Sequence, residues 1–92
     1  MKKEPLALMA EPDDEEDFDV SAEALERGQR ARIIRRTRSD LGLTEAEFAA
    51  RFRMPAGTLR DWEQGRATPP DFALAYVTVI ARFPDMVAEA LG

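Results

Sequence analysis

The chain has 92 residues and a formal net charge of −5 at pH 7, with 45% hydrophobic residues and neither cysteine nor histidine. This length allows one small domain and a tail, which excludes an enzyme with separate cofactor and substrate domains. Disulfides, thiol nucleophiles, imidazole bases and the usual zinc sites are excluded too. We therefore expect no catalytic residue, no metal and no cofactor.

The sequence shows no sign of membrane insertion or export. Its apolar stretches are far shorter than the roughly 20 residues that a bilayer requires. The first residues, MKKEP, lack the apolar region of a secretory signal. We expect a cytoplasmic protein with no membrane partner.

Charge is divided unevenly along the chain. Residues 1–26 hold two lysines against ten acidic residues, a net of −8, whereas residues 27–92 hold eleven arginines against eight acidic residues, a net of +3. Seven of the nine residues from Glu11 to Asp19 are acidic, and such blocks stay solvated and extended. We therefore expect residues 1–20, here named the acidic arm, to be flexible and disordered, and residues 21–92 to form the folded domain.

A first helix is predicted over about residues 22–41. Ser21 is a suitable N-cap, and Glu23 and Glu26 lie in the first turn, where the helix dipole favours negative charge. Gly42 then ends the helix. The helix carries several arginines. We expect three of them to form a solvated face: Arg27, Arg30 and Arg32.

Two short helices follow. The run TEAE at residues 44–47 is a capping box, in which Thr44 and Glu47 each bind the backbone amide of the other. The second helix is short because the residue before Pro55 is disfavoured in the α region. A third helix is predicted from about Pro55 to about Gln64, ended by Gly65. The spacing assigns four large side chains of this region to the core: Phe48, Phe52, Leu59 and Trp62.

A fourth helix is predicted after Pro69 and Pro70. Its apolar face is traced by residues at spacings of one, three and four: Phe72, Ala73, Tyr76, Val77, Ile80 and Phe83. Pro84 predicts the start of a fifth, short helix over residues 86–91. No alternating stretch of strand length occurs, so the fold class is all-α with five helices.

Two short helices joined by a tight turn and preceded by a basic helix are the parts of a helix-turn-helix. The runs IRRTR (34–38), LGLTEAEFA (41–49) and TLRDWEQGR (58–66), followed by Pro69, resemble the Xre or Cro/C1-type helix-turn-helix family over roughly residues 31–83. The WEQG loop, the fourth helix bounded by prolines and the small size are similar to HigA-like antitoxins of type II toxin-antitoxin operons.

The resemblance implies positions for the core and for DNA contacts. Core positions are Leu43, Phe48, Ala49, Met54, Leu59 and Trp62, and an expected pair, Arg38 with Glu63, ties the first helix to the end of the third. The predicted DNA contacts are Arg35, Arg38, Thr44, Ala56, Gly57, Thr58, Arg60, Asp61 and Arg66. We expect Arg36 and Arg53 to neutralise phosphate with them.

This chain departs from the family pattern at the recognition positions. Glu45 stands where a glutamine is usual, Ala56 and Gly57 lack amide side chains, and Asp61 is acidic. Direct readout must then depend chiefly on Arg60 bound to a guanine and Thr58 bound to a methyl or phosphate, with a cytosine amine as the candidate partner of Asp61. Gly57 either lets the backbone approach DNA closely or indicates weakened binding.

The leading interpretation is a homodimeric repressor and antitoxin that binds a double-stranded operator and neutralises a cognate toxin, expected to be a basic ribonuclease. The dimer interface is assigned to Tyr76, Phe83, Met86, Val87 and Leu91. The acidic arm is assigned to the toxin, with apolar anchors and acidic groups at Leu6, Leu8, Asp13, Asp14, Glu15, Glu16, Asp17, Phe18 and Asp19.

Three alternatives stay open. The helix-turn-helix could be a scaffold that binds no DNA while the arm inhibits a basic partner, or the protein could be a plain Xre-type regulator without a toxin. The acidic arm could also be a solubilising tail. A calcium loop is discounted, because the glycine and ligand spacing of an EF-hand are missing.

Overall fold

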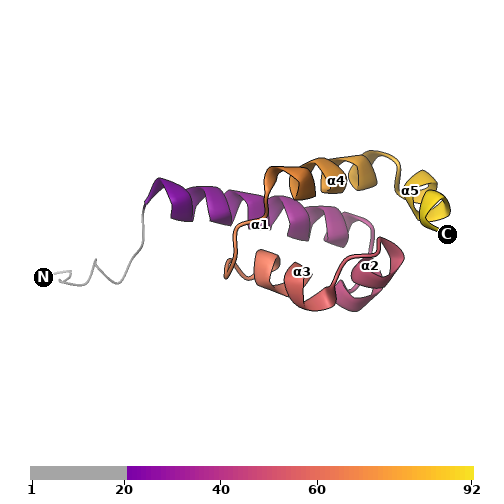
Figure 1. Ribbon diagram of the computed structural model, residues 1–92, viewed down its shortest axis with the longest axis horizontal. Helices are drawn as coiled ribbons and strands as arrows, with labels where there is room; N and C mark the ends of the chain where they lie inside the picture. Colours follow the sequence, from indigo (N-terminus) through magenta and orange to yellow (C-terminus); the bar gives the residue numbers. More distant parts are fainter. Residues whose placement is uncertain (1–20) are drawn as a thin grey trace, which may run out of the picture.

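The computed structural model describes residues 21–92, which form five α-helices and no strand. The helices are α1 (Ala22–Asp40), α2 (Glu45–Arg51), α3 (Ala56–Glu63), α4 (Asp71–Arg82) and α5 (Pro84–Leu91). The long helix α1 lies between the α2–α3 pair and α4, and α5 packs against α4 (Figure 1). The all-α prediction with five helices is confirmed. The acidic arm, with every residue assigned to toxin binding, lies outside the described residues.

Local capping sets the ends of α1 and α2 as the sequence predicts. The Ser21 side chain accepts from the Ala24 amide at 3.1 Å, and Gly42 ends α1 with φ +71°. At α2 both bonds of the capping box are present: the Glu47 amide donates to Thr44 Oγ1 at 3.1 Å, and the Thr44 amide donates to Glu47 Oε1 at 2.8 Å. These bonds satisfy amides that a helix start would leave unpaired.

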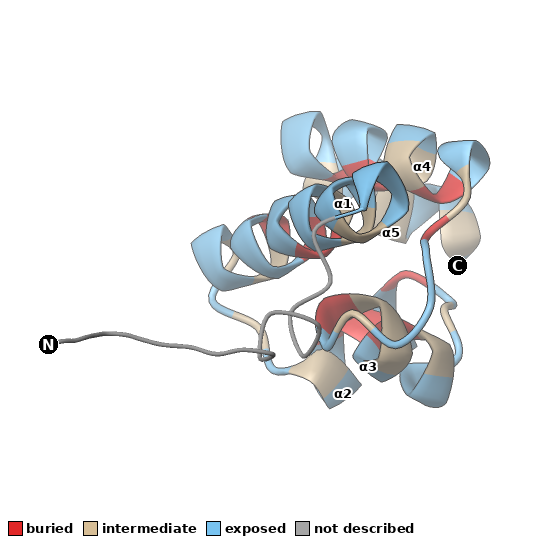
Figure 2. Ribbon diagram, turned by 90° about the vertical axis from the view of Figure 1, so that its left-hand side faces the viewer, coloured by how far each residue is buried: buried red, intermediate tan, exposed pale blue. Residues whose placement is uncertain are grey.

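One core joins α1, the helix-turn-helix and α4. Its fully buried side chains are Ile34, Phe48, Phe52, Leu59, Val77 and Ile80, and Figure 2 shows the buried segments facing one another between the helices. The rings of Phe48 and Phe52 lie 4.9 Å apart and are tilted by 58°, a favourable geometry for an aromatic pair. Leu43, Met54 and Trp62 are partly buried against this core, so its predicted members are confirmed.

Two predicted members of the α4 face lie outside the core. Phe72 is 74% exposed and Phe83 is 52% exposed. Phe72 is in the first turn of α4, about 100° around the helix from the buried Ala73. Phe83 has left helical geometry, with φ −137° and ψ 58°, so its side chain no longer follows the apolar face. Both aromatic rings therefore add to the outer surface.

Arg30 also differs from expectation, because it is not a solvated residue. Its Nη1 donates to the Pro69 carbonyl at 2.7 Å, and its Nη2 contacts Glu26 at 2.6 Å and Asp71 at 2.9 Å. The hydrogen bond with Asp71 is the main reason that the pKa of Arg30 is raised. Arg30 thus ties α1 to the loop before α4, a partnership across about 40 residues that local patterns do not reveal.

The turn between α2 and α3 contains a strained residue. Arg53 has φ +57°, a left-handed conformation that costs a residue with a side chain about 1 kcal/mol. The turn is held by the Met54 amide, which donates to the Ala49 carbonyl at 2.8 Å. The Tyr76 hydroxyl donates to the Phe52 carbonyl at 2.7 Å, and burial raises the pKa of Tyr76, so α4 supports the turn through a neutral phenol.

Among residues 21–92, no helix combines the length and the apolar character that crossing a bilayer requires.

Gly28, inside α1, and Gly42, just after its end, make a matched pair of variants. A methyl group at either position meets no atom within 4 Å, so backbone conformation decides the result. Gly42→Ala should cost about 1 kcal/mol, because alanine is strained at φ +71°. Gly28→Ala, inside α1, should add about 0.4–1 kcal/mol of stability. Urea unfolding followed by circular dichroism at 222 nm measures both, and equal signs would contradict the assigned end of α1.

Candidate DNA-binding surface

Helix α3 turns one side to the core and the opposite side to solvent. Leu59 and Glu63, one helical turn apart, are its buried residues. Ala56, Gly57 and Arg60 are exposed. Two further predicted contacts, Thr58 and Asp61, are half-buried. The outward face of α3 is therefore open along its length and carries one cationic side chain, that of Arg60, which is 52% exposed.

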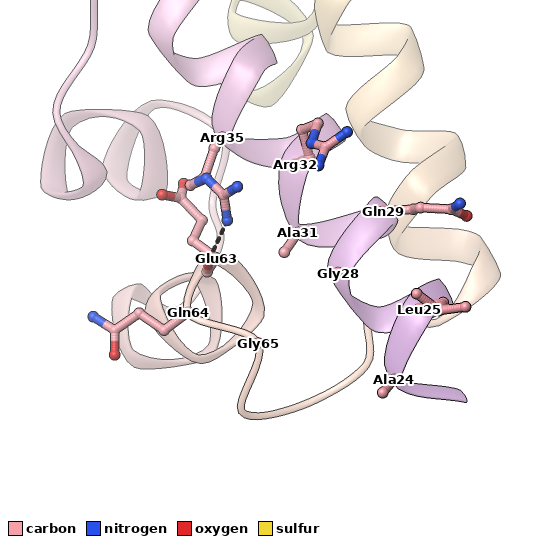
Figure 3. A pocket seen from close by; sticks show the side chains of 10 residues that line it. All are labelled: Ala24, Leu25, Gly28, Gln29, Ala31, Arg32, Arg35, Glu63, Gln64 and Gly65. Atoms are coloured by element: carbon pink, nitrogen blue, oxygen red, sulfur yellow. Dashed lines mark hydrogen bonds between the residues drawn. The ribbon is translucent and has the colours of Figure 1, made fainter. Parts of the chain in front are cut away.

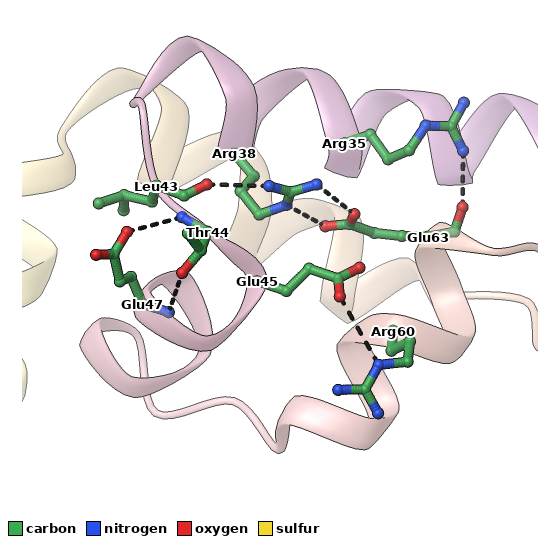
Figure 4. A network of polar contacts seen from close by, with 8 residues as sticks. All are labelled: Arg35, Arg38, Leu43, Thr44, Glu45, Glu47, Arg60 and Glu63. Carbon is green, nitrogen blue, oxygen red and sulfur yellow. Dashed lines mark hydrogen bonds and ion pairs between the residues drawn. The ribbon is translucent and has the colours of Figure 1, made fainter.

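The end of α3 is tied to α1 by a charged pair. Glu63 is only 3% exposed, and its two carboxylate oxygens accept from Nε and Nη2 of Arg38 at 2.8 and 2.9 Å (Figure 4). Arg38 Nη1 also donates to the Leu43 carbonyl at 3.0 Å. The hydrogen bonds to Glu63 raise the pKa of Arg38. The pair suggested by the resemblance is present, with the planar two-point geometry that makes such pairs strong.

Arg35 also contacts the C-terminal end of α3. Its Nη1 donates to the Glu63 main-chain carbonyl at 2.7 Å, which satisfies a carbonyl that lies past the last helical hydrogen bonds. A cation here also complements the negative end of the α3 dipole. Arg35 and Arg38 are thus gathered at the C-terminal end of α3, where Arg66 follows on the next loop with 68% of its side chain exposed. These three arginines lie at the C-terminal end of α3, and we name them the cationic collar.

Two acidic residues lie beside the predicted DNA-contacting arginines. Glu45, the first residue of α2, is 3.8 Å from Arg60 Nε, and Asp61 is 3.8 Å from Arg66 Nη1 (Figure 4 shows the first pair). Exposed ion pairs of this length contribute little to stability. They do place a carboxylate where a phosphate or base would have to compete for the arginine.

Two other predicted contacts are used within the fold. The Thr44 hydroxyl caps α2. The Arg53 guanidinium donates through Nη2 to the Leu91 carbonyl at 2.5 Å, so this cation lies against the end of α5. The partner lies 38 positions away in the sequence, so local sequence patterns do not predict this contact.

The residues assigned to a dimer interface lie on or near the α4–α5 surface. Phe83 and Met86 are exposed, whereas Tyr76, Val87 and Leu91 are half-buried. Exposed Phe72 and Val79 extend the apolar area along α4. We name this set the α4–α5 apolar surface.

No protein-family model matches the chain, and no curated protein matches it. A solved structure does: a crystal structure of an HTH XRE-family like protein from Agrobacterium tumefaciens is similar, with a TM-score of 0.63 and 50% sequence identity. The match covers 65% of this chain and 97% of that chain.

The fold and the exposed α3 define a helix-turn-helix protein of the DNA-binding regulator class. Because the chain is 50% identical to this solved protein and covers 97% of it, the chain belongs to the XRE-like helix-turn-helix family.

The Arg38–Glu63 pair can be tested by a double-mutant cycle. Arg38→Ala leaves the buried Glu63 carboxylate without its partner. Glu63→Ala leaves the half-buried guanidinium of Arg38 without its carboxylate. Each should therefore cost about 3–5 kcal/mol, whereas the double variant should cost clearly less than their sum. Arg36→Ala, an exposed neighbour on α1, is the control and should change stability by less than about 0.5 kcal/mol. Additive losses in urea unfolding would show that the two groups do not interact.

Proposed function

We propose that this protein is a transcriptional repressor that binds its own operator as a homodimer and also acts as an antitoxin. The observation that carries the DNA-binding part is the exposed outward face of α3, with Arg60 at its centre and the cationic collar of Arg35, Arg38 and Arg66 at its end. A recognition helix reads base edges while neighbouring cations bind phosphate.

Dimerisation is part of the proposal because one helix-turn-helix contacts few base pairs. A two-fold partner places a second α3 one turn of DNA away, about 34 Å. The α4–α5 apolar surface is the proposed interface, since it contains Phe72 and Met86, which are 74% and 65% exposed. Several large exposed apolar side chains on neighbouring helices of a small domain are typical of a protein interface.

The antitoxin part is supported by the resemblance to HigA-like proteins and by the composition of the acidic arm. A ribonuclease toxin is basic because it binds RNA, and an acidic segment with apolar anchors complements such a surface. Residues 1–20 combine eight acidic residues with Leu6, Leu8 and Phe18. A basic nuclease encoded beside this protein would be the partner.

One observation favours a second candidate function, a partner-binding module whose helix-turn-helix binds no DNA. Glu45 lies 3.8 Å from Arg60, so the main base-reading side chain already has an acidic neighbour. This alternative requires that a duplex from the upstream region of the gene shows no salt-dependent binding, and fluorescence anisotropy at 50 and 200 mM salt decides between the two.

Arg60 and Arg66 should separate base readout from phosphate binding. Arg60→Ala should cost about 1–3 kcal/mol on the operator and relax sequence preference, because a bidentate contact to guanine is lost. Arg66→Ala should weaken operator and random duplexes alike and lower the salt slope by about one. Anisotropy titrations on both duplexes measure this, and equal losses on the two duplexes for both variants would refute the assigned roles.

Glu45→Gln should tighten DNA binding. It removes the carboxylate beside Arg60, which releases the guanidinium and lowers repulsion of phosphate, so affinity should rise roughly twofold to fivefold. Glu89→Gln is the control, because it changes the net charge equally at an exposed position on α5, outside the candidate DNA-binding surface. If both variants raise affinity by the same factor, net charge alone acts and Glu45 does not restrain Arg60.

A further inference from the structure

Helix α1 presents arginines that the rest of the described domain leaves unpaired. Arg32, Arg35, Arg36 and Arg38 line a depression of about 370 Å³ together with Ser39. Among residues 21–92, no carboxylate forms an ion pair with Arg32 or Arg36. Arg35 uses Nη1 on the Glu63 carbonyl and keeps its other donors. We name Arg32, Arg35 and Arg36 the α1 arginine patch.

A groove connects this patch to the N-terminal end of α1. It has a volume of about 460 Å³ and separates α1 from residues 63–65, the end of α3 and the start of the loop that follows it. Figure 3 shows Ala24 and Ala31 on the side of α1 that faces this loop, with Arg35 reaching across to Glu63. Gly28 lies between the two alanines. These small residues keep the groove open, and Arg32 and Arg35 line it as well.

The acidic arm enters the domain at this end of α1 and has the opposite charge. Residues 1–20 hold two lysines against eight acidic residues, a net of −6, and residues 21–92 hold eleven arginines against ten acidic residues, a net of +1. A tether of this kind holds its charges near the patch at an effective concentration in the millimolar range. Binding within one chain is therefore favoured over capture of a free anion.

The acidic residues of the arm can reach the level of the α1 arginine patch along α1. Arg32 to Arg36 lie 11 to 15 residues after Ser21, about 17–23 Å along a helix that rises 1.5 Å per residue. Asp13 to Asp17 lie four to eight residues before Ser21 and can reach about 13–28 Å when extended. Phe18, three residues before Ser21, reaches about 10 Å, the level of Gly28 in the groove.

We infer that the acidic arm folds back along α1, with Phe18 in the groove and Asp13 to Asp17 on the α1 arginine patch, and so competes with DNA phosphate for these arginines. The competition rests on the proposed DNA-binding function, whereas docking of the arm does not. A basic partner that takes up the arm would release the patch for DNA.

Docking is tested on the full chain without DNA. The sequence has no cysteine, so Ala10→Cys gives one attachment site for a nitroxide label next to the acidic block. Amide NMR signals of residues 32–36 should broaden more than those of residues 85–89 at 50 mM salt. The excess should disappear at 500 mM salt and in a variant with Asp13→Asn, Asp14→Asn, Glu15→Gln and Glu16→Gln. Equal broadening of the two regions at 50 mM salt would overturn docking.

Competition is tested with two charge-matched variants. Asp14→Asn with Glu15→Gln removes two charges from the arm, and Asp85→Asn with Glu89→Gln removes two from α5. The arm variant should bind duplex DNA roughly three to ten times more tightly than the α5 variant at 50 mM salt, with a smaller ratio at 200 mM. If NMR shows docking but the arm variant and the α5 variant bind DNA with equal affinity, the competition is overturned. Absence of all DNA binding would overturn the proposed function and with it the competition, while docking would be judged by NMR alone.

Discussion

The buried carboxylate of Glu63 determines how α3 is attached to the rest of this domain. A charge that is 3% exposed is tolerated only when it is fully paired, and Arg38 provides two parallel hydrogen bonds from the neighbouring helix. Arg35 binds the main-chain carbonyl of the same residue. The last turn of α3 is therefore fixed to α1 at a single position, and the outward face of α3 takes its orientation from that attachment.

The same attachment explains why the cations of this surface do not act independently. Arg35 and Arg38 are held in place by α3, so in the proposed complex with DNA both would already be ordered and would lose little side-chain entropy on binding. Arg60 and Arg66 each have a carboxylate neighbour at 3.8 Å, Glu45 and Asp61 respectively. The proposed DNA binding would then exchange these acidic neighbours for phosphate, which would make it sensitive to salt and to competing acidic segments.

Local chemistry made much of the fold predictable. The cap at Ser21, the capping box at Thr44 and the glycine at 42 act within four residues, so the sequence alone located the ends of α1 and the start of α2. The core aromatics followed from helical spacing. Contacts of Arg30 and Arg53 could not be anticipated, because their partners lie 38 to 41 residues away. The exposure of Phe72 was not predicted, because spacing does not show where the neighbouring helices stop covering α4. Phe83 is exposed because the chain leaves helical geometry there.

Every cation between residues 21 and 92 is an arginine, and the two lysines of the chain, Lys2 and Lys3, both belong to the acidic arm. Guanidinium groups keep their charge at any pH at which the domain is folded. Reagents and enzymes that acylate side-chain amines can therefore modify the arm but leave the charge of the helical domain unchanged. An amine-reactive dye or resin would attach through the arm and leave the α3 surface chemically intact.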